Sequence, residues 1–183
     1  MKTALKYGVM IGVASILISL ISYLINPALI FNMKLGIGLS SIVTVVLLVL
    51  ALKEERKINE GILTFGDGLK TTFIAYAIGS FMSILFGYTL MNHIDPSLID
   101  TGLEYSLEMA ESALNGIADL VEMPEAEKDK QLEEMRSPEK VAELRDAFSF
   151  SSNMVSFLFT LIFPGLLFWL IIPAIMKKNP QGV

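Results

Sequence analysis

Few side chains in this chain could carry out acid–base or metal chemistry, and they form no dense cluster. The chain has no cysteine, and its only histidine, His93, is followed by Asp95 and Ser97. His93 and Asp95 would supply two metal ligands, whereas zinc sites use three or four protein ligands. Hydrolysis requires a nucleophile aligned with a base, and Ser97, four residues after His93, is a weak partner for it. We therefore expect no catalytic residue, no metal site and no enzymatic activity.

A pair of glycines, Gly66-x-Gly68, stands before an apolar block, where a phosphate-binding loop would stand. A dinucleotide fingerprint also requires a preceding strand and a third glycine, and a Walker motif requires Gly-Lys followed by Ser or Thr. Neither pattern is present, so we expect no nucleotide or other cofactor and no nucleic-acid partner. Residues 53–70 are instead predicted to form a turn at the membrane surface, with Asp67 capping the helix that follows.

Any site would have to be positioned by four apolar blocks. Apolar residues make up 53% of the 183 residues, charged residues 18%, and the mean hydropathy is +0.59, which excludes a disordered chain. The blocks cover residues 7–25, 35–52, 71–91 and 154–176, and none contains a charged side chain. Each can cross a bilayer as a helix, and none alternates like a barrel strand. The sequence predicts an all-α polytopic integral membrane protein, with residues 1–183 forming one membrane domain of four transmembrane helices in a bundle.

The distribution of charge predicts the orientation of these helices. Four spans place both termini on one side together with residues 53–70, and that side has eight basic and four acidic residues. The other side has six basic and fifteen acidic residues. Basic residues favour the cytoplasm, so we expect both termini there and an acidic loop, residues 92–153, outside. We also expect the first block to be retained, because its apolar run exceeds that of a signal peptide and no A-x-A site follows.

Small residues recur at helical spacing in two blocks. The first block carries Gly8, Gly12, Ser15, Ser19 and Ser22, and the third carries Ala75, Gly79, Ser83 and Gly87. Such faces permit close helix packing in a membrane, and their hydroxyls could alternatively line a polar path for a solute. We favour packing, because ion paths usually contain an ionisable residue and the blocks have none. Pro164 cannot bond to the carbonyl of Thr160, which predicts a kink in the last block.

The loop of residues 92–153 is predicted to be helical. Asp95-Pro96 and Ser137-Pro138 are typical helix starts, and Asn115-Gly116 is a candidate early end for the first helix. An apolar seam follows the first start at spacings of three and four, with the members Leu103, Leu107, Ala110, Leu114, Ile117 and Val121. We expect a helical hairpin outside the membrane that buries this seam against itself, the membrane surface or a partner. The fifteen acidic residues of the loop could bind a cation or a basic partner, but we expect chiefly a solvated face.

The order of these features resembles a known family. Leu63-Thr64-Phe65-Gly66 and Lys70 lead into the third block, Ile94-Asp95-Pro96 leaves it, and a long acidic helical loop precedes a last span that ends in lysines. Over essentially the whole chain this pattern is similar to the bacterial four-span membrane protein family "domain of unknown function 4199". The resemblance implies an inner-membrane protein with four helices. It supplies no catalytic residues, because the family has no established activity.

Two functions remain open at this point. The small-residue faces, the outer seam and the lack of reactive clusters favour a non-enzymatic membrane protein that acts through contacts. Its partner, besides the lipid bilayer, would be another membrane protein or further copies of the chain. The alternative is a small oligomeric transporter or channel, which the hydroxyl-bearing faces and the Pro164 kink suggest. Carriers built from repeats show matching halves, and Pro164 has no counterpart in the second block.

Overall fold

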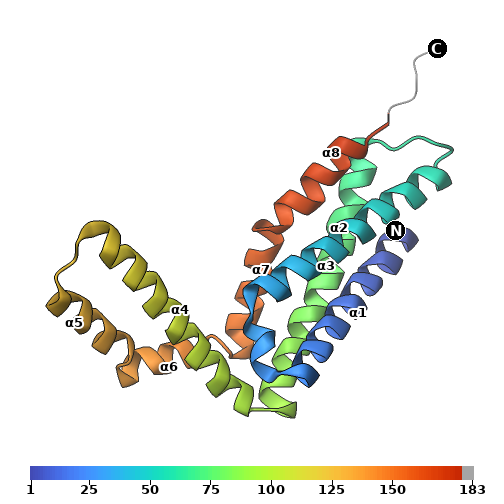
Figure 1. Cartoon of the computed structure of the whole chain (residues 1–183). Coiled ribbons are helices and arrows are strands. Elements are labelled where there is room, and N and C mark those ends of the chain that lie inside the picture. Colours follow the sequence, from blue (N-terminus) through green and yellow to red (C-terminus); the bar gives the residue numbers. More distant parts are fainter. Residues whose placement is uncertain (179–183) are drawn as a thin grey trace. The chain divides into compact units, whose positions relative to one another are not determined.

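A computed structural model describes residues 1–178, except for the side chains of residues 33–37. These residues are all-α, with no strand among them (Figure 1). The chain divides into two compact units. Unit 1 comprises Met1–Gly87 and the chain from Met154 onward, and unit 2 comprises Tyr88–Asn153.

The apolar helices make up unit 1, apart from two helix ends that belong to unit 2. They are α1 (Lys2–Ile25), the short 3-10 helix Pro27–Phe31, α2 (Met33–Ile58), α3 (Phe65–Thr89), α7 (Phe150–Ile162), the π-helical segment Leu167–Ile171 and α8 (Ile172–Met176). The two ends in unit 2 are the last two residues of α3 and the first four of α7. In the described part of the chain, three helical stretches are long and apolar enough to cross a membrane: Lys2–Ile25, Phe65–Ile94 and Phe150–Met176. The predicted block 35–52 lies in α2, and its first three side chains fall outside the described set. A fourth span therefore stays a prediction.

The helices of unit 1 expose apolar side chains along one face and bury small ones along another. On α1 the exposed residues are Leu5, Val9, Val13, Leu17 and Ile21, one for each turn. Soluble proteins rarely expose continuous apolar surfaces of this extent, whereas a bilayer covers them without cost. The apolar helices and these faces together indicate a membrane protein.

The core of unit 1 lies toward the end that holds the N-terminus. Tyr7 and Ile11 of α1, Leu48 and Ala51 of α2 and Ala75 of α3 form its buried cluster. At the same end, the Lys6 ammonium donates to the Glu54 carboxylate at 2.6 Å. Leu63 and Lys178 also exchange two backbone hydrogen bonds there, at 3.0 and 2.9 Å. The helices are thus fastened together at one end.

The prediction that Asp67 caps the third apolar helix is wrong. The helix α3 begins at Phe65, and Thr64 caps it, because the Asp67 amide donates to Thr64 Oγ1 at 3.1 Å. The same hydroxyl donates to Asp67 Oδ2 at 2.6 Å, which makes a reciprocal capping pair. Gly66 and Gly68 are therefore helical residues, and the connection between α2 and α3 is shorter than the expected 53–70.

Unit 2 consists of three helices, α4 (Ser97–Val121), α5 (Glu125–Met135) and α6 (Pro138–Asp146), preceded by the π-helical segment Leu90–Ile94. Ion pairs join Glu111 to Arg136 and Asp100 to Arg145. As the residue numbers increase along α4, those of the ion-pair partners decrease. The chain from α5 to α6 therefore runs antiparallel to α4 (Figure 1). The candidate early end at Asn115-Gly116 is not used, because α4 continues through it to Val121.

Candidate functional site

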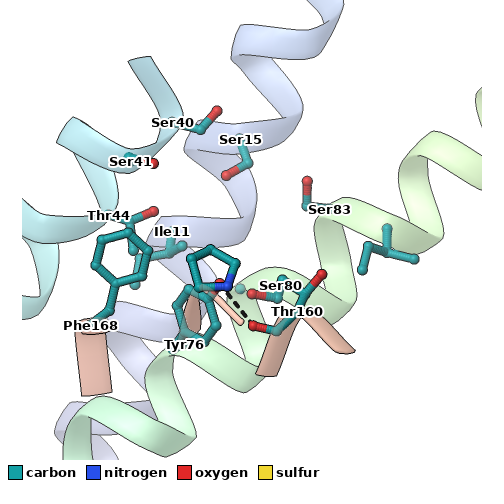
Figure 2. Close-up of a pocket in the computed structure, with 13 residues that line it drawn as sticks. Ile11, Ser15, Ser40, Ser41, Thr44, Tyr76, Ser80, Ser83, Thr160 and Phe168 are labelled. Carbon is teal, nitrogen blue, oxygen red and sulfur yellow. Dashed lines mark hydrogen bonds between the residues drawn. The ribbon is translucent and has the colours of Figure 1, made fainter. Parts of the chain in front are cut away.

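A cavity of about 330 Å³ lies among the helices of unit 1. Hydroxyl groups dominate its polar lining, and Figure 2 shows the side chains that carry them gathered around one space. The contributors are Ser15 from α1, Ser40, Ser41 and Thr44 from α2, Tyr76, Ser80 and Ser83 from α3, and Thr160 from α7. None of the lining residues is charged. The cavity can therefore exchange hydrogen bonds with a ligand but offers it no counter-charge.

The rest of the wall is apolar and closes the cavity toward the N-terminal end. Ile11, Ile84 and Phe168 contribute apolar surface. Ile11 also belongs to the buried core, together with Leu48 and Ala75, which have no exposed surface. On each helix the core residues follow the cavity residues toward that end. In this structure the cavity is a pocket that ends at the core.

One edge of the cavity is shaped by the break at Pro164. The helix α7 ends at Ile162 and helical structure resumes at Gly165, so Pro164 lies where the sequence predicted a kink. A proline cannot donate to the carbonyl four residues before it, and the Tyr76 hydroxyl donates to that Thr160 carbonyl instead, at 3.4 Å (Figure 2). Added to Gly165, a Cβ would lie 2.7 Å from the same carbonyl oxygen. Tyr76 thus supplies the hydrogen bond that Pro164 cannot make, and Gly165 leaves room for the Thr160 carbonyl.

Two further side-chain hydrogen bonds satisfy backbone carbonyls of the broken helix, one from the helix itself and one from α3. The Trp169 indole donates to the Leu161 carbonyl at 2.8 Å. The buried Thr72 hydroxyl is 3.0 Å from the Trp169 carbonyl and 2.9 Å from that of Gly68. In hydrocarbon every backbone polar group needs a partner in the protein, which explains these polar side chains in apolar helices. Sequence reasoning missed Tyr76, Thr72 and Trp169, although a proline inside a span signals that such donors are needed.

The predicted small-residue faces meet where α1 and α3 cross. A Cβ on Gly79 would lie 2.4 Å from Ile11 Cγ2, and one on Gly8 would lie 3.0 Å from the Ala75 carbonyl oxygen. Gly12 is equally close to Met82, since a Cβ there would lie 2.7 Å from the sulfur. These positions require glycine because the helices approach so closely.

The remaining members of the two faces have other surroundings. Ser15 and Ser83 line the cavity, Ser19 and Ser22 are half-buried, and Gly87 has open space around it. One face of each helix therefore serves both packing and the cavity lining.

The predicted seam of unit 2 divides into two parts. Leu103 and Leu114 are 5% and 6% exposed, whereas Ile117 and Val121 are 53% and 62% exposed. Leu107 is half-buried beside α6. The first part of the seam is thus buried, and the last part is surface.

No acidic, basic or histidine side chain of the described residues lines the cavity. No group of three or more His, Asp or Glu side chains that could hold a metal ion occurs among them, and the His93 ring packs edge-on against Tyr88. Lys6 and Tyr7 both donate to Glu54, and these hydrogen bonds hold the pKa of its carboxyl below the ordinary value. Through these two hydrogen bonds the Glu54 carboxylate links α1 to α2.

Comparison with known proteins finds one family. A family model described as "Protein of unknown function (DUF4199)" matches residues 6–178, the family that the sequence resembles. The match covers nearly all of the chain and includes residues of both units. No curated protein and no solved structure matches the chain.

Proposed function

This chain belongs to the DUF4199 family, and we propose that it is a four-span protein of the bacterial inner membrane that acts through protein contacts and catalyses no reaction. In this proposal both termini are cytoplasmic and unit 2 lies outside. The absence of charge from all four apolar blocks supports the spans, and the distribution of basic residues supports the orientation. The family model includes unit 2 as well as the apolar helices, so a common role should involve both.

The observation that carries the contact role is an exposed apolar patch at the end of α4. Ile117, Leu120 and Val121, which we call the α4 patch, are 53%, 85% and 62% exposed. Their spacing of three and four places them on one face of the helix. Exposed apolar residues that cluster in this way mark interaction sites.

The charge of unit 2 indicates which kind of partner the α4 patch fits. Residues 92–153 contain fifteen acidic and five basic residues. Three of the basic residues already form ion pairs within the unit, namely Arg136 with Glu111, Arg145 with Asp100 and Lys140 with Glu143. Asp119 and Glu122, beside the patch, are exposed. A second copy would bring like charge, so we assign the patch to a basic amphipathic segment of another membrane protein.

Crosslinking in intact cells tests this assignment. The chain has no cysteine, so Leu120→Cys provides a single thiol in the α4 patch, and Glu127→Cys provides a matched exposed thiol on α5. We expect a thiol–amine crosslinker to give a heterologous adduct from position 120 and none from position 127. Adding Asp119→Lys should reduce the adduct several-fold, because a rim charge of the wrong sign slows association. Peptide mapping should place the crosslink on a lysine-rich segment.

The same variants report the orientation. A membrane-impermeant maleimide should label position 120 in intact cells, whereas Glu60→Cys, between α2 and α3, should be labelled only after lysis. An adduct of twice the chain's mass would replace the proposed partner with a second copy. Equal adducts from positions 120 and 127, or no response to Asp119→Lys, would contradict the contact role of the patch.

The hydroxyl-lined cavity is the specific observation in favour of the alternative, a small oligomeric transporter. Its lining supplies hydrogen bonds within apolar helices, as a path for an uncharged solute would require. Its closure by the core residues Leu48 and Ala75 favours binding over conduction in this conformation. We therefore treat the cavity as a binding site.

A further inference from the structure

We propose that the cavity of unit 1 binds the head of an uncharged amphiphile, a lipid whose head carries hydroxyl or carbonyl oxygens. This inference goes beyond the contact role of unit 2, and it requires only that the apolar helices lie in a bilayer.

The cavity selects against charge. Its lining contains no Asp, Glu, Lys, Arg or His, and it is surrounded by apolar helices. An ionic head group brought into such a site would lose its hydration without gaining a counter-ion. Phosphate-bearing lipids and free ions are therefore poor ligands.

The cavity also offers hydrogen bonds to a ligand. Each Ser or Thr hydroxyl can donate one hydrogen bond and accept others, and Figure 2 shows such groups from three sides of the space. Ser15, Thr44 and Ser83 represent α1, α2 and α3. A ligand with several oxygens, either hydroxyl or carbonyl, could bond to more than one helix at once.

The volume of about 330 Å³ lies at the lower end of the range for ligand pockets. It accommodates a small head group and no long chain. The remainder of an amphiphile would have to lie outside the cavity, against an apolar surface.

Access favours a ligand that comes from the membrane. The core closes the cavity toward the N-terminal end, so that end provides no aqueous route. The helix that contributes Thr160 exposes Leu158, Phe159 and Ile162 beside it. These side chains form an apolar surface along which the chains of a lipid could lie while its head occupies the cavity.

The emission of Trp169, the single tryptophan, provides the assay. Trp169 neighbours the lining residue Phe168, so occupancy of the cavity should change its surroundings. The purified full chain in neutral detergent would be titrated with three probes: dioctanoylglycerol, the anionic lipid dioctanoyl-phosphatidylglycerol and free glycerol. We expect a saturable change with dioctanoylglycerol and none with the other two.

Variants locate the site. The triple variant Ser15→Ala, Thr44→Val, Ser83→Ala removes one hydroxyl from each of three helices, and we expect about tenfold weaker binding, equivalent to about 1.4 kcal/mol. Its matched control is Ser19→Ala with Ser22→Ala, which removes two α1 hydroxyls from outside the lining and should leave the affinity unchanged. Ser83→Leu, which fills the cavity with a side chain, is an independent variant that should abolish binding.

The outcomes distinguish a lipid head group from a free polyol as the ligand. Saturable binding of free glycerol that the triple variant weakens would support the hydroxyl site and overturn its assignment to a lipid. Binding of the anionic lipid as tightly as dioctanoylglycerol would overturn the selection against charge. No saturable change with any probe, or equal affinities in the triple variant and its control, would overturn the proposal as a whole.

Discussion

Units 1 and 2 are both helical, yet they hold their helices together by different interactions. In unit 1, α1 and α3 approach so closely that a methyl group on Gly79 would overlap Ile11. In unit 2, leucines such as Leu103 and Leu114 are buried, and the ion pair of Glu111 with Arg136 joins α4 to the returning chain. Among the described residues of unit 1, Lys6 and Glu54 form an ion pair, and it lies at the end that holds the N-terminus.

A difference in surroundings, lipid around the apolar helices and water around unit 2, would explain this contrast. In water, burial of leucine supplies free energy in proportion to the apolar area removed from the solvent. Lipid tails are as apolar as leucine, so helices in a membrane associate through close contact at small residues and through hydrogen bonds. The helices of unit 1 should therefore respond most to added volume, and those of unit 2 most to lost volume.

The largest expected effect is the loss of volume at Leu114, in unit 2. Replacing this buried leucine by alanine should lower the free energy of opening of unit 2 by about 3 kcal/mol, from lost burial and a new cavity. Ile117→Ala, three residues away on the exposed part of the seam, should change it by less than about 0.5 kcal/mol. Hydrogen exchange of α5 and α6 in the full chain measures both. Equal effects of the two variants would contradict the division of the seam.

The next effect is added volume in unit 1. Gly79→Ala should destabilise the crossing of α1 and α3 by about 2 kcal/mol, because the new methyl would force Ile11 aside in a packed interface. Gly87→Ala, on the same helix but in open space, is the control and should be neutral or slightly stabilising. Unfolding in mixed micelles compares the two variants. A Gly79→Ala protein as stable as the Gly87→Ala protein would show that α1 and α3 do not pack closely there.

Much of the fold follows from local pattern. The apolar helices, the helix starts near Asp95 and Ser137 and the family are predicted correctly, because each depends on residues close together in sequence. The cap of α3 was misassigned because Thr64 and Asp67 are both good capping residues, and only the geometry selects Thr64. The division of the seam was not predictable, because it depends on how the other helices pack against α4.

The cavity illustrates a further limit of sequence reasoning. Ser15 and Ser83 were found as members of packing faces, but their meeting with Thr44 and Thr160 depends on how four helices are arranged. Tyr76 was missed because its partner, the Thr160 carbonyl, is available only after Pro164 breaks a distant helix. Contacts of this kind are tertiary, and helical spacing in the sequence does not predict them.

The smallest expected effect concerns pH and the ion pair of unit 2. The hydrogen bond from Arg136 lowers the pKa of the Glu111 carboxyl in the folded protein. A group with a lowered folded pKa stabilises the folded state above its unfolded pKa, about 4.3 for glutamate, and the effect is lost as the pH falls through the folded value. The Glu111→Gln variant should therefore exchange its α5 amides slightly faster than the parent near neutral pH.

This small difference should disappear in acid, once Glu111 is protonated in the parent as well. Comparing the two proteins at each pH removes the intrinsic pH dependence of exchange, and Glu108→Gln, an exposed glutamate on α4, controls for the loss of charge. Because the Arg136 side chain is exposed to solvent, added salt should also weaken the difference. A difference that persisted below the folded pKa would mean that Glu111 acts through packing. Charge would then contribute as little in unit 2 as it does in the uncharged spans of unit 1, and the contrast between the units would rest on leucine burial alone.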